Sequence, residues 1–161
     1  MAVIKLGSGL EKRDGVYGFA TAGVDNLRTG KPVKLDTNGN YVPVSAASDK
    51  IAGFSYWGLY QTPTQNGLSK EDKHEVLDSS VVVRTTNYMF DSFRAGEQFN
   101  LIKEGYELVI VCADVNAGDD VYYDLATGLY TNVSTNNLKV GNSKFEADAA
   151  NGDALFVYLT R

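Results

Sequence analysis

The chain has 161 residues and a formal net charge of −5, with 43% hydrophobic and 22% charged residues. This composition is typical of one folded domain, 1–161, with its own core, rather than of a disordered chain. Basic residues are scattered, and the adjacent pair Lys12 and Arg13 is flanked by Glu11 and Asp14. Because binding to a phosphate backbone needs clustered Lys and Arg, we expect no nucleic-acid partner.

No apolar run approaches membrane-spanning length, and residues 1–15 resemble neither a signal peptide nor an anchor. We therefore expect synthesis in the cytoplasm and no membrane partner. The single cysteine, Cys112, excludes an intrachain disulfide. Sixteen Gly, ten Tyr and seven Phe predict a turn-rich β protein.

Residues 1–15 predict an N-terminal arm, because glycines and charged residues follow a short apolar start. Val3, Ile4 and Leu6 have two interpretations. They form an edge strand of the chain's own sheet, or they pair with a neighbouring molecule by strand addition. The sequence leaves both interpretations open.

Residues 30–45 predict a β-hairpin. Val33 and Leu35 lie two positions apart, which places both side chains on one face of a strand. Asp36 and Gly39 are typical turn residues. An Asp side chain accepts hydrogen bonds from nearby backbone N–H groups, and Gly tolerates a positive φ. We therefore expect a strand, a turn and a return strand.

The same pattern recurs in residues 118–134, where Val121 and Tyr123 share a strand face and Gly128 closes the turn. A looser copy spans residues 96–112, with a turn expected at Gly105. Three such hairpins are enough to bury a shared apolar face. The fold prediction is all-β: a small antiparallel β-barrel or β-sandwich built from repeated hairpins.

Two further strands are expected near the middle and end of the chain. Residues 108–112 are five consecutive apolar residues, which favours a central strand buried on both faces. Residues 154–159 form another short apolar run. We expect this run to be the last strand.

The segment 54–60 is rich in aromatic residues, which dominate both cores and interfaces. Phe54 is expected in the core. Trp57 faces the opposite side of the strand, and for Trp57 and Tyr60 both a core position and an interface position stay open. The polar stretch 61–80 that follows is predicted to be a surface insertion loop.

The insertion holds His74, the only histidine, beside Glu71, Glu75 and Asp78. Residues four apart would share a helix face, so a metal site is one interpretation. A solvated charged face is the favoured one, because zinc sites normally need several imidazole or thiolate ligands. We expect no metal and no cofactor.

No catalytic constellation stands out, so we expect no catalytic residues and no enzyme activity. Cys112 and His74 lie in unlike settings. The segment 36–40 resembles a calcium loop only faintly, and a hairpin turn explains it better. Asp119 and Asp120 follow a turn glycine, where solvated acids are usual. A hydrolase using an acidic pair ranks last among the hypotheses.

The turn signals form an ordered set that covers most of residues 25–161. The set comprises Gly30-x-x-Val33-x-Leu35-Asp36-x-x-Gly39, Ile51-Ala-Gly53, Ala95-Gly96, Val115-x-Ala117-Gly118-Asp119-x-Val121-x-Tyr123-Asp124, Thr127-Gly128, Val140-Gly141, Ala149-Ala-Asn-Gly152, Val157 and Leu159. This order resembles the capsid cement or decoration proteins of tailed bacteriophages. The longer insertion at 60–80 departs from that pattern.

The resemblance implies a non-enzymatic virion protein on the outer capsid surface, made in the host cytoplasm. It would bind the major capsid protein and bridge neighbouring subunits, as a homo-oligomer such as a dimer or trimer. We expect the arm and the aromatic segment to supply the contact surface. The predicted capsid-facing residues are Val3, Ile4, Leu6, Trp57 and Tyr60.

A second hypothesis is a carbohydrate- or receptor-binding β-module of a phage head fibre or tail. Exposed aromatic rings stack on sugars, and the chain offers Tyr56, Trp57, Tyr60 and Tyr88. Both hypotheses share the β fold, so the fold alone does not separate them.

Overall fold

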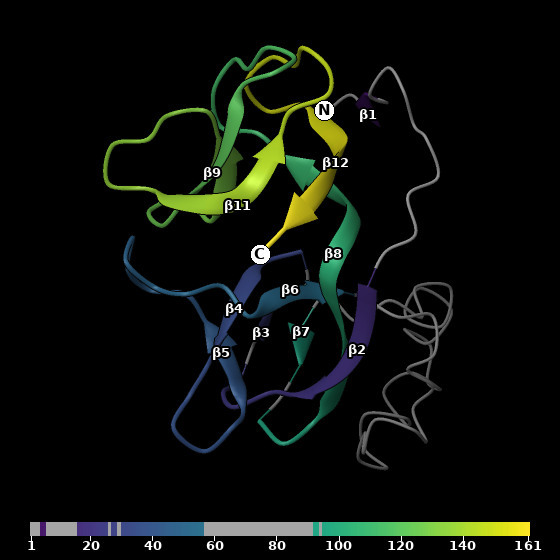
Figure 1. The fold of residues 1–161 in the computed structure, drawn as a ribbon, viewed down its shortest axis with the longest axis vertical. Coiled ribbons are helices and arrows are strands. Elements are labelled where there is room, and N and C mark those ends of the chain that lie inside the picture. Colours follow the sequence, from purple (N-terminus) through teal and green to yellow (C-terminus); the bar gives the residue numbers. More distant parts are fainter. Residues whose placement is uncertain (1–3, 6–15, 26, 29, 57–91, 94) are drawn as a thin grey trace, which may run out of the picture.

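The computed structural model describes residues 4–5, 16–25, 27–28, 30–56, 92–93 and 95–161 (Figure 1). Within these residues all regular secondary structure is β-strand. The described residues therefore contain no helix that is long and apolar enough to cross a membrane. The all-β prediction is confirmed. The predicted insertion 61–80 and most of the predicted arm lie outside the described residues.

The strands form a large sheet and two small ones. They are β1 (Ile4–Lys5), β2 (Val16–Thr21), β3 (Leu27–Arg28), β4 (Pro32–Leu35), β5 (Tyr41–Pro43), β6 (Gly53–Tyr56), β7 (Ser92–Phe93), β8 (Gln98–Ile110), β9 (Asp120–Asp124), β10 (Leu129–Thr131), β11 (Leu138–Lys144) and β12 (Ala154–Thr160). The seven-stranded sheet has the order β1-β12-β8-β6-β4-β5, with β2 also paired to β8. A three-stranded sheet has the order β10-β9-β11, and β3 pairs with β7.

Strand β8 connects the two halves of the molecule (Figure 1). Its first half pairs antiparallel with β2 and β6, and its second half with β12. Consecutive side chains of a strand point to opposite faces, so Leu101 and Ile102 enter different cores. One strand therefore supplies both hydrophobic cores.

The lower core in Figure 1 lies among β2, β3, β4, β7 and the start of β8, and the upper core lies mainly among β8, β9, β11 and β12. Phe93 stacks on Phe99 in the lower core with ring centroids 5.2 Å apart. Tyr123 meets Tyr130 edge-on at 5.4 Å in the upper core. Phe54, predicted to be a core residue, is buried in the upper core and confirms that prediction.

Two of the three predicted hairpins are present. Strands β4 and β5 pair antiparallel around the turn 36–40, and β9 and β10 pair around a turn that Gly128 closes at a φ of 70°. Val33 is fully buried, whereas Leu35 on the same strand face is 53% exposed. Leu35 is the last residue of β4, so it extends beyond the edge of the core.

The third predicted hairpin is wrong. Residues 98–110 form one continuous strand, and Gly105 lies inside it opposite Leu159. Pairing with β12 continues without a break from Glu104 to Ile110, so the chain does not reverse there. A glycine inside a strand is a weak turn signal when both neighbours keep a ladder partner.

Burial of the apolar run 108–112 on both faces is also wrong. Val109 and Val111 are buried, but Ile110 is 42% exposed. One face of this part of the sheet meets the upper core and the other meets solvent, as antiparallel sheets allow. Strand β8 lies between β12 and β6 in the sheet order, which makes the strand as a whole central. Its part after Gly105 pairs with β12 alone among the described strands, because β6 pairs with residues 100–102 and β2 with residues 98–104.

Candidate functional site

The predicted contact residues lie mostly outside the described residues: Val3, Leu6, Trp57 and Tyr60. Ile4 is described as backbone, and it pairs in parallel with Ala154 of the chain's own β12. The described part of the arm thus follows the own-sheet interpretation. No described surface brings the arm and the aromatic segment together, so a contact role for these residues remains a prediction.

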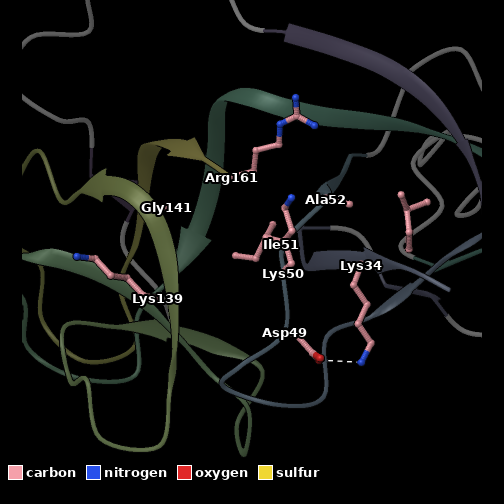
Figure 2. A pocket seen from close by; sticks show the side chains of 9 residues that line it. Lys34, Asp49, Lys50, Ile51, Ala52, Lys139, Gly141 and Arg161 are labelled. Atoms are coloured by element: carbon pink, nitrogen blue, oxygen red, sulfur yellow. Dashed lines mark hydrogen bonds and ion pairs between the residues drawn. The ribbon is translucent and has the colours of Figure 1, made fainter.

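A pocket of about 990 Å³ opens at the junction of the two halves (Figure 2). Strand β4 and the segment 49–52 form one side, and β11 and Arg161, the residue after β12, form the other. The lining residues are Lys34, Leu35, Asp49, Lys50, Ile51, Ala52, Lys139, Gly141 and Arg161. Four of these side chains are basic and one is acidic.

Asp49 shapes the first side of the pocket. Its Oδ2 accepts hydrogen bonds from the backbone N–H groups of Ser45 at 2.7 Å and Ala46 at 2.9 Å, which closes the turn after β5. It also accepts one from Lys34 Nζ at 2.8 Å. The Lys34 bond and these backbone donors hold the pKa of Asp49 down at about 2. Lys34 and Asp49 therefore form an ion pair on the wall.

Gly141 and Thr160 shape the second side. Gly141 has a φ of 47°, and a Cβ there would lie 2.4 Å from the Thr160 carbonyl oxygen. The Asn142 N–H donates to Thr160 Oγ1 at 2.8 Å, and the Thr160 N–H donates to Ser143 Oγ at 2.8 Å. These contacts tie β12 to β11 and place the next residue, Arg161, at the rim.

The basic residues of the pocket differ in their partners. Lys139 Nζ lies 3.6 Å from Asp120 Oδ2 and points away from the pocket in Figure 2. Lys50 and Arg161 form no ion pair with any described residue, and both are exposed. Chemically, the pocket offers two available cations to an anionic group.

A buried carboxyl group lies near the same junction. Glu107 of β8 is only 2% exposed, and its Oε2 has no hydrogen-bond partner among the described residues. Burial raises the pKa of Glu107 to about 8, so it is mainly protonated at neutral pH. Tyr130 is buried as well, and its hydroxyl donates to the Gly30 carbonyl at 2.9 Å.

Lys31 adds a contact across the junction. Its Nζ donates to the Gly128 carbonyl and lies 6.0 Å from the centre of the Tyr123 ring. Desolvation, and then the nearby charge of Arg28, lower the pKa of Lys31. Together with the Tyr130 hydrogen bond, this contact fixes the hairpins of the two halves against each other.

The turn carboxylates serve the backbone. Asp36 Oδ1 accepts from the N–H groups of Asn38 at 2.8 Å and Asn40 at 2.9 Å, which confirms the hairpin-turn interpretation of this segment. Asp119 accepts from the Asn116 N–H and from Asn132 Nδ2 at 2.9 and 2.7 Å, and these bonds lower its pKa. Both acids thus act as turn closures.

Other predicted features lie outside the described residues: Glu71, His74, Glu75, Asp78, Trp57, Tyr60 and Tyr88. Within the described ranges, no three His, Cys, Asp or Glu side chains gather closely enough to hold a metal ion. The metal and sugar-stacking hypotheses of the sequence therefore stay untested.

Comparison with known proteins decides the family. A family model described as structural cement protein (E217 gp24/Pam3 gp6) matches residues 8–160. The chain belongs to this family of phage structural cement proteins. The resemblance seen in the ordered turn signals is thereby confirmed. Membership implies a structural, non-enzymatic role in the virion and association with capsid proteins.

A solved structure supports the fold of this cement protein. A chain from "The capsid of Myoviridae Phage XM1" aligns with a TM-score of 0.62 and 16% sequence identity. The alignment covers 100% of this chain and 92% of that one. No curated protein matches the sequence.

Sequence reasoning missed the pocket and the buried carboxyl for different reasons. Lys50 and Arg161 are far apart in the chain, and no pattern links them. Glu107 could have been found from the sequence, because it lies two residues before the buried Val109 and its side chain therefore faces the same side of the strand. An acid at a core position of a strand predicts a buried carboxyl.

Proposed function

We propose that the chain is a decoration protein that binds the outside of the phage head and stabilises contacts between major capsid subunits. The match of the cement-protein family model to residues 8–160 carries this proposal. The fold also suits the task, because one long strand shared by two cores makes a rigid connector.

Stabilisation would act by mass action. A protein that binds the assembled lattice, and not free subunits, shifts the equilibrium toward the lattice by its binding free energy at each site. Because the same contact recurs at many sites over the shell, a modest binding free energy at each site adds up to a large stabilisation of the whole shell. We propose the major capsid protein as the partner and a homo-oligomer, dimer or trimer, as the bound form. Predicted contact residues remain Val3, Ile4, Leu6, Trp57 and Tyr60.

The copy number of this protein in purified particles tests the proposal. Quantitative mass spectrometry should give a ratio to the major capsid protein within a few-fold of one, because a cement role requires repeated sites. A handful of copies per particle would contradict decoration and point to a head fibre or tail component. Absence from particles would overturn the proposal.

A further inference from the structure

We infer that the pocket between β4 and β11 is the docking site for an acidic segment of the major capsid protein, which Lys50 and Arg161 hold by its carboxylates. The inference rests on the proposed function, since it takes the capsid protein as the partner. It differs from the sequence-based prediction, which placed the contact surface on the arm and the aromatic segment.

The charge of the pocket selects the occupant. The protein carries a net charge of −5, yet the lining side chains are four bases against one acid. An acidic partner is repelled by the molecule as a whole and attracted at this opening.

Lys50 and Arg161 are the bases available to a partner. Lys34 is held by Asp49 at 2.8 Å, and Lys139 lies 3.6 Å from Asp120. In Figure 2 the amino group of Lys50 lies toward the guanidinium of Arg161 and away from the Lys34–Asp49 pair. A carboxylate entering there meets a guanidinium, which binds carboxylates in a bidentate geometry.

The volume and the apolar lining of the pocket further restrict which segment of the capsid protein can bind there. A volume of about 990 Å³ lies at the upper end of the range of roughly 300–1,000 Å³ for small-ligand pockets, so a few residues of chain fit. Leu35, largely exposed, and Ile51 add apolar surface beside the cations. The structure thus favours a short segment in which carboxylates flank an apolar side chain.

Binding to heads stripped of this protein tests the inference. We compare wild type, the double variant Lys50→Gln/Arg161→Gln, and the control double variant Lys103→Gln/Lys144→Gln, which loses the same charge at side chains that do not line the pocket. The expected result is about a tenfold or greater loss of affinity for the first double variant and little change for the control. Circular dichroism checks that both variants fold.

The outcomes separate this inference from the proposed function. Equal binding by wild type and the Lys50/Arg161 variant overturns the pocket assignment and leaves decoration standing. Equal loss in both double variants also overturns it, because only net charge then matters. Failure of the wild type to bind heads overturns both.

A probe of defined chemistry gives a second readout. A hexaglutamate peptide, titrated into the full-length protein, should bind the wild type and the control more tightly than the Lys50/Arg161 variant. A DNA oligonucleotide is the competing occupant. Tighter binding of DNA than of hexaglutamate at equal ionic strength would contradict a protein segment as the ligand.

Discussion

Glu107 is an ionisable side chain in an apolar position, and its proton is part of the folded structure. Its Oε2 is buried without a hydrogen-bond partner among the described residues, so charging it in place is unfavourable. Desolvation raises the pKa of Glu107 from 4.5 to about 8. In the unfolded chain the carboxyl regains water and its usual pKa.

This difference predicts a pH-dependent stability. Between the unfolded pKa of 4.5 and the folded pKa of about 8, the folded state holds a proton that the unfolded state has released. The contribution of Glu107 to stability is therefore fully present below the lower value and is lost as pH rises through the upper one. The loss between pH 5 and 8 is on the order of 3 kcal/mol.

The Glu107→Gln variant should remove this dependence, because a neutral amide does not titrate. Urea unfolding at pH 5 and pH 8 measures the effect as the change in the free energy of unfolding. Glu104→Gln, on the same strand but half-exposed, is the matched control and should keep the wild-type slope. Parallel pH profiles for wild type and Glu107→Gln would show that Glu107 is ionised in the folded state.

At the scale of elements, the contact between β11 and β12 depends on one glycine. Gly141 combines a φ of 47° with a Cβ position 2.4 Å from the Thr160 carbonyl oxygen. The Thr160 backbone cannot move aside as a flexible side chain can. A methyl group added at Gly141 must therefore push β11 and β12 apart. The same contact positions the rim of the pocket.

Gly141→Ala should therefore destabilise the protein by more than about 3 kcal/mol, the sum of left-handed backbone strain and a backbone clash. Gly118→Ala is the control, since Gly118 has a φ of 93° with nothing within 4 Å of its Cβ position. It reports backbone strain alone, about 1–2 kcal/mol. Equal losses in thermal or urea unfolding would rule out the clash.

At the scale of the whole molecule, β8 makes the two cores interdependent. Leu101 packs in the lower core and its neighbour Ile102 in the upper one, and both are fully buried. Disordering β8 removes ladder partners from β2 and β6 in the lower half and from β12 in the upper half. We therefore expect the described halves to unfold together.

Leu101→Ala and Ile102→Ala test this coupling. Each should cost about 2–5 kcal/mol, through lost burial and a residual cavity, and each should shift one shared unfolding transition. Amide exchange in β12, which packs in the upper core, should quicken even in Leu101→Ala. Two separate transitions, with β12 protected in Leu101→Ala, would show that the halves are independent.

The sequence by itself predicted the all-β class, the hairpins at 30–45 and 118–134, the last strand and the cement-protein family. These features are encoded locally, because a turn glycine or an alternating apolar pattern determines the conformation of the few residues around it. Gly105 misled the prediction, since the same residue type serves in a turn or inside a strand. Only pairing with Leu159, distant in sequence, decided between them.

The tertiary structure alone decided the division into two cores and the position of the pocket. Leu101 and Ile102 look alike in sequence, and their assignment to different cores depends on which strands cover each face of β8. Lys50 and Arg161 line one pocket only because β12 is tied to β11 opposite the 49–52 segment. Packing between distant segments sets such positions, and no local pattern encodes them.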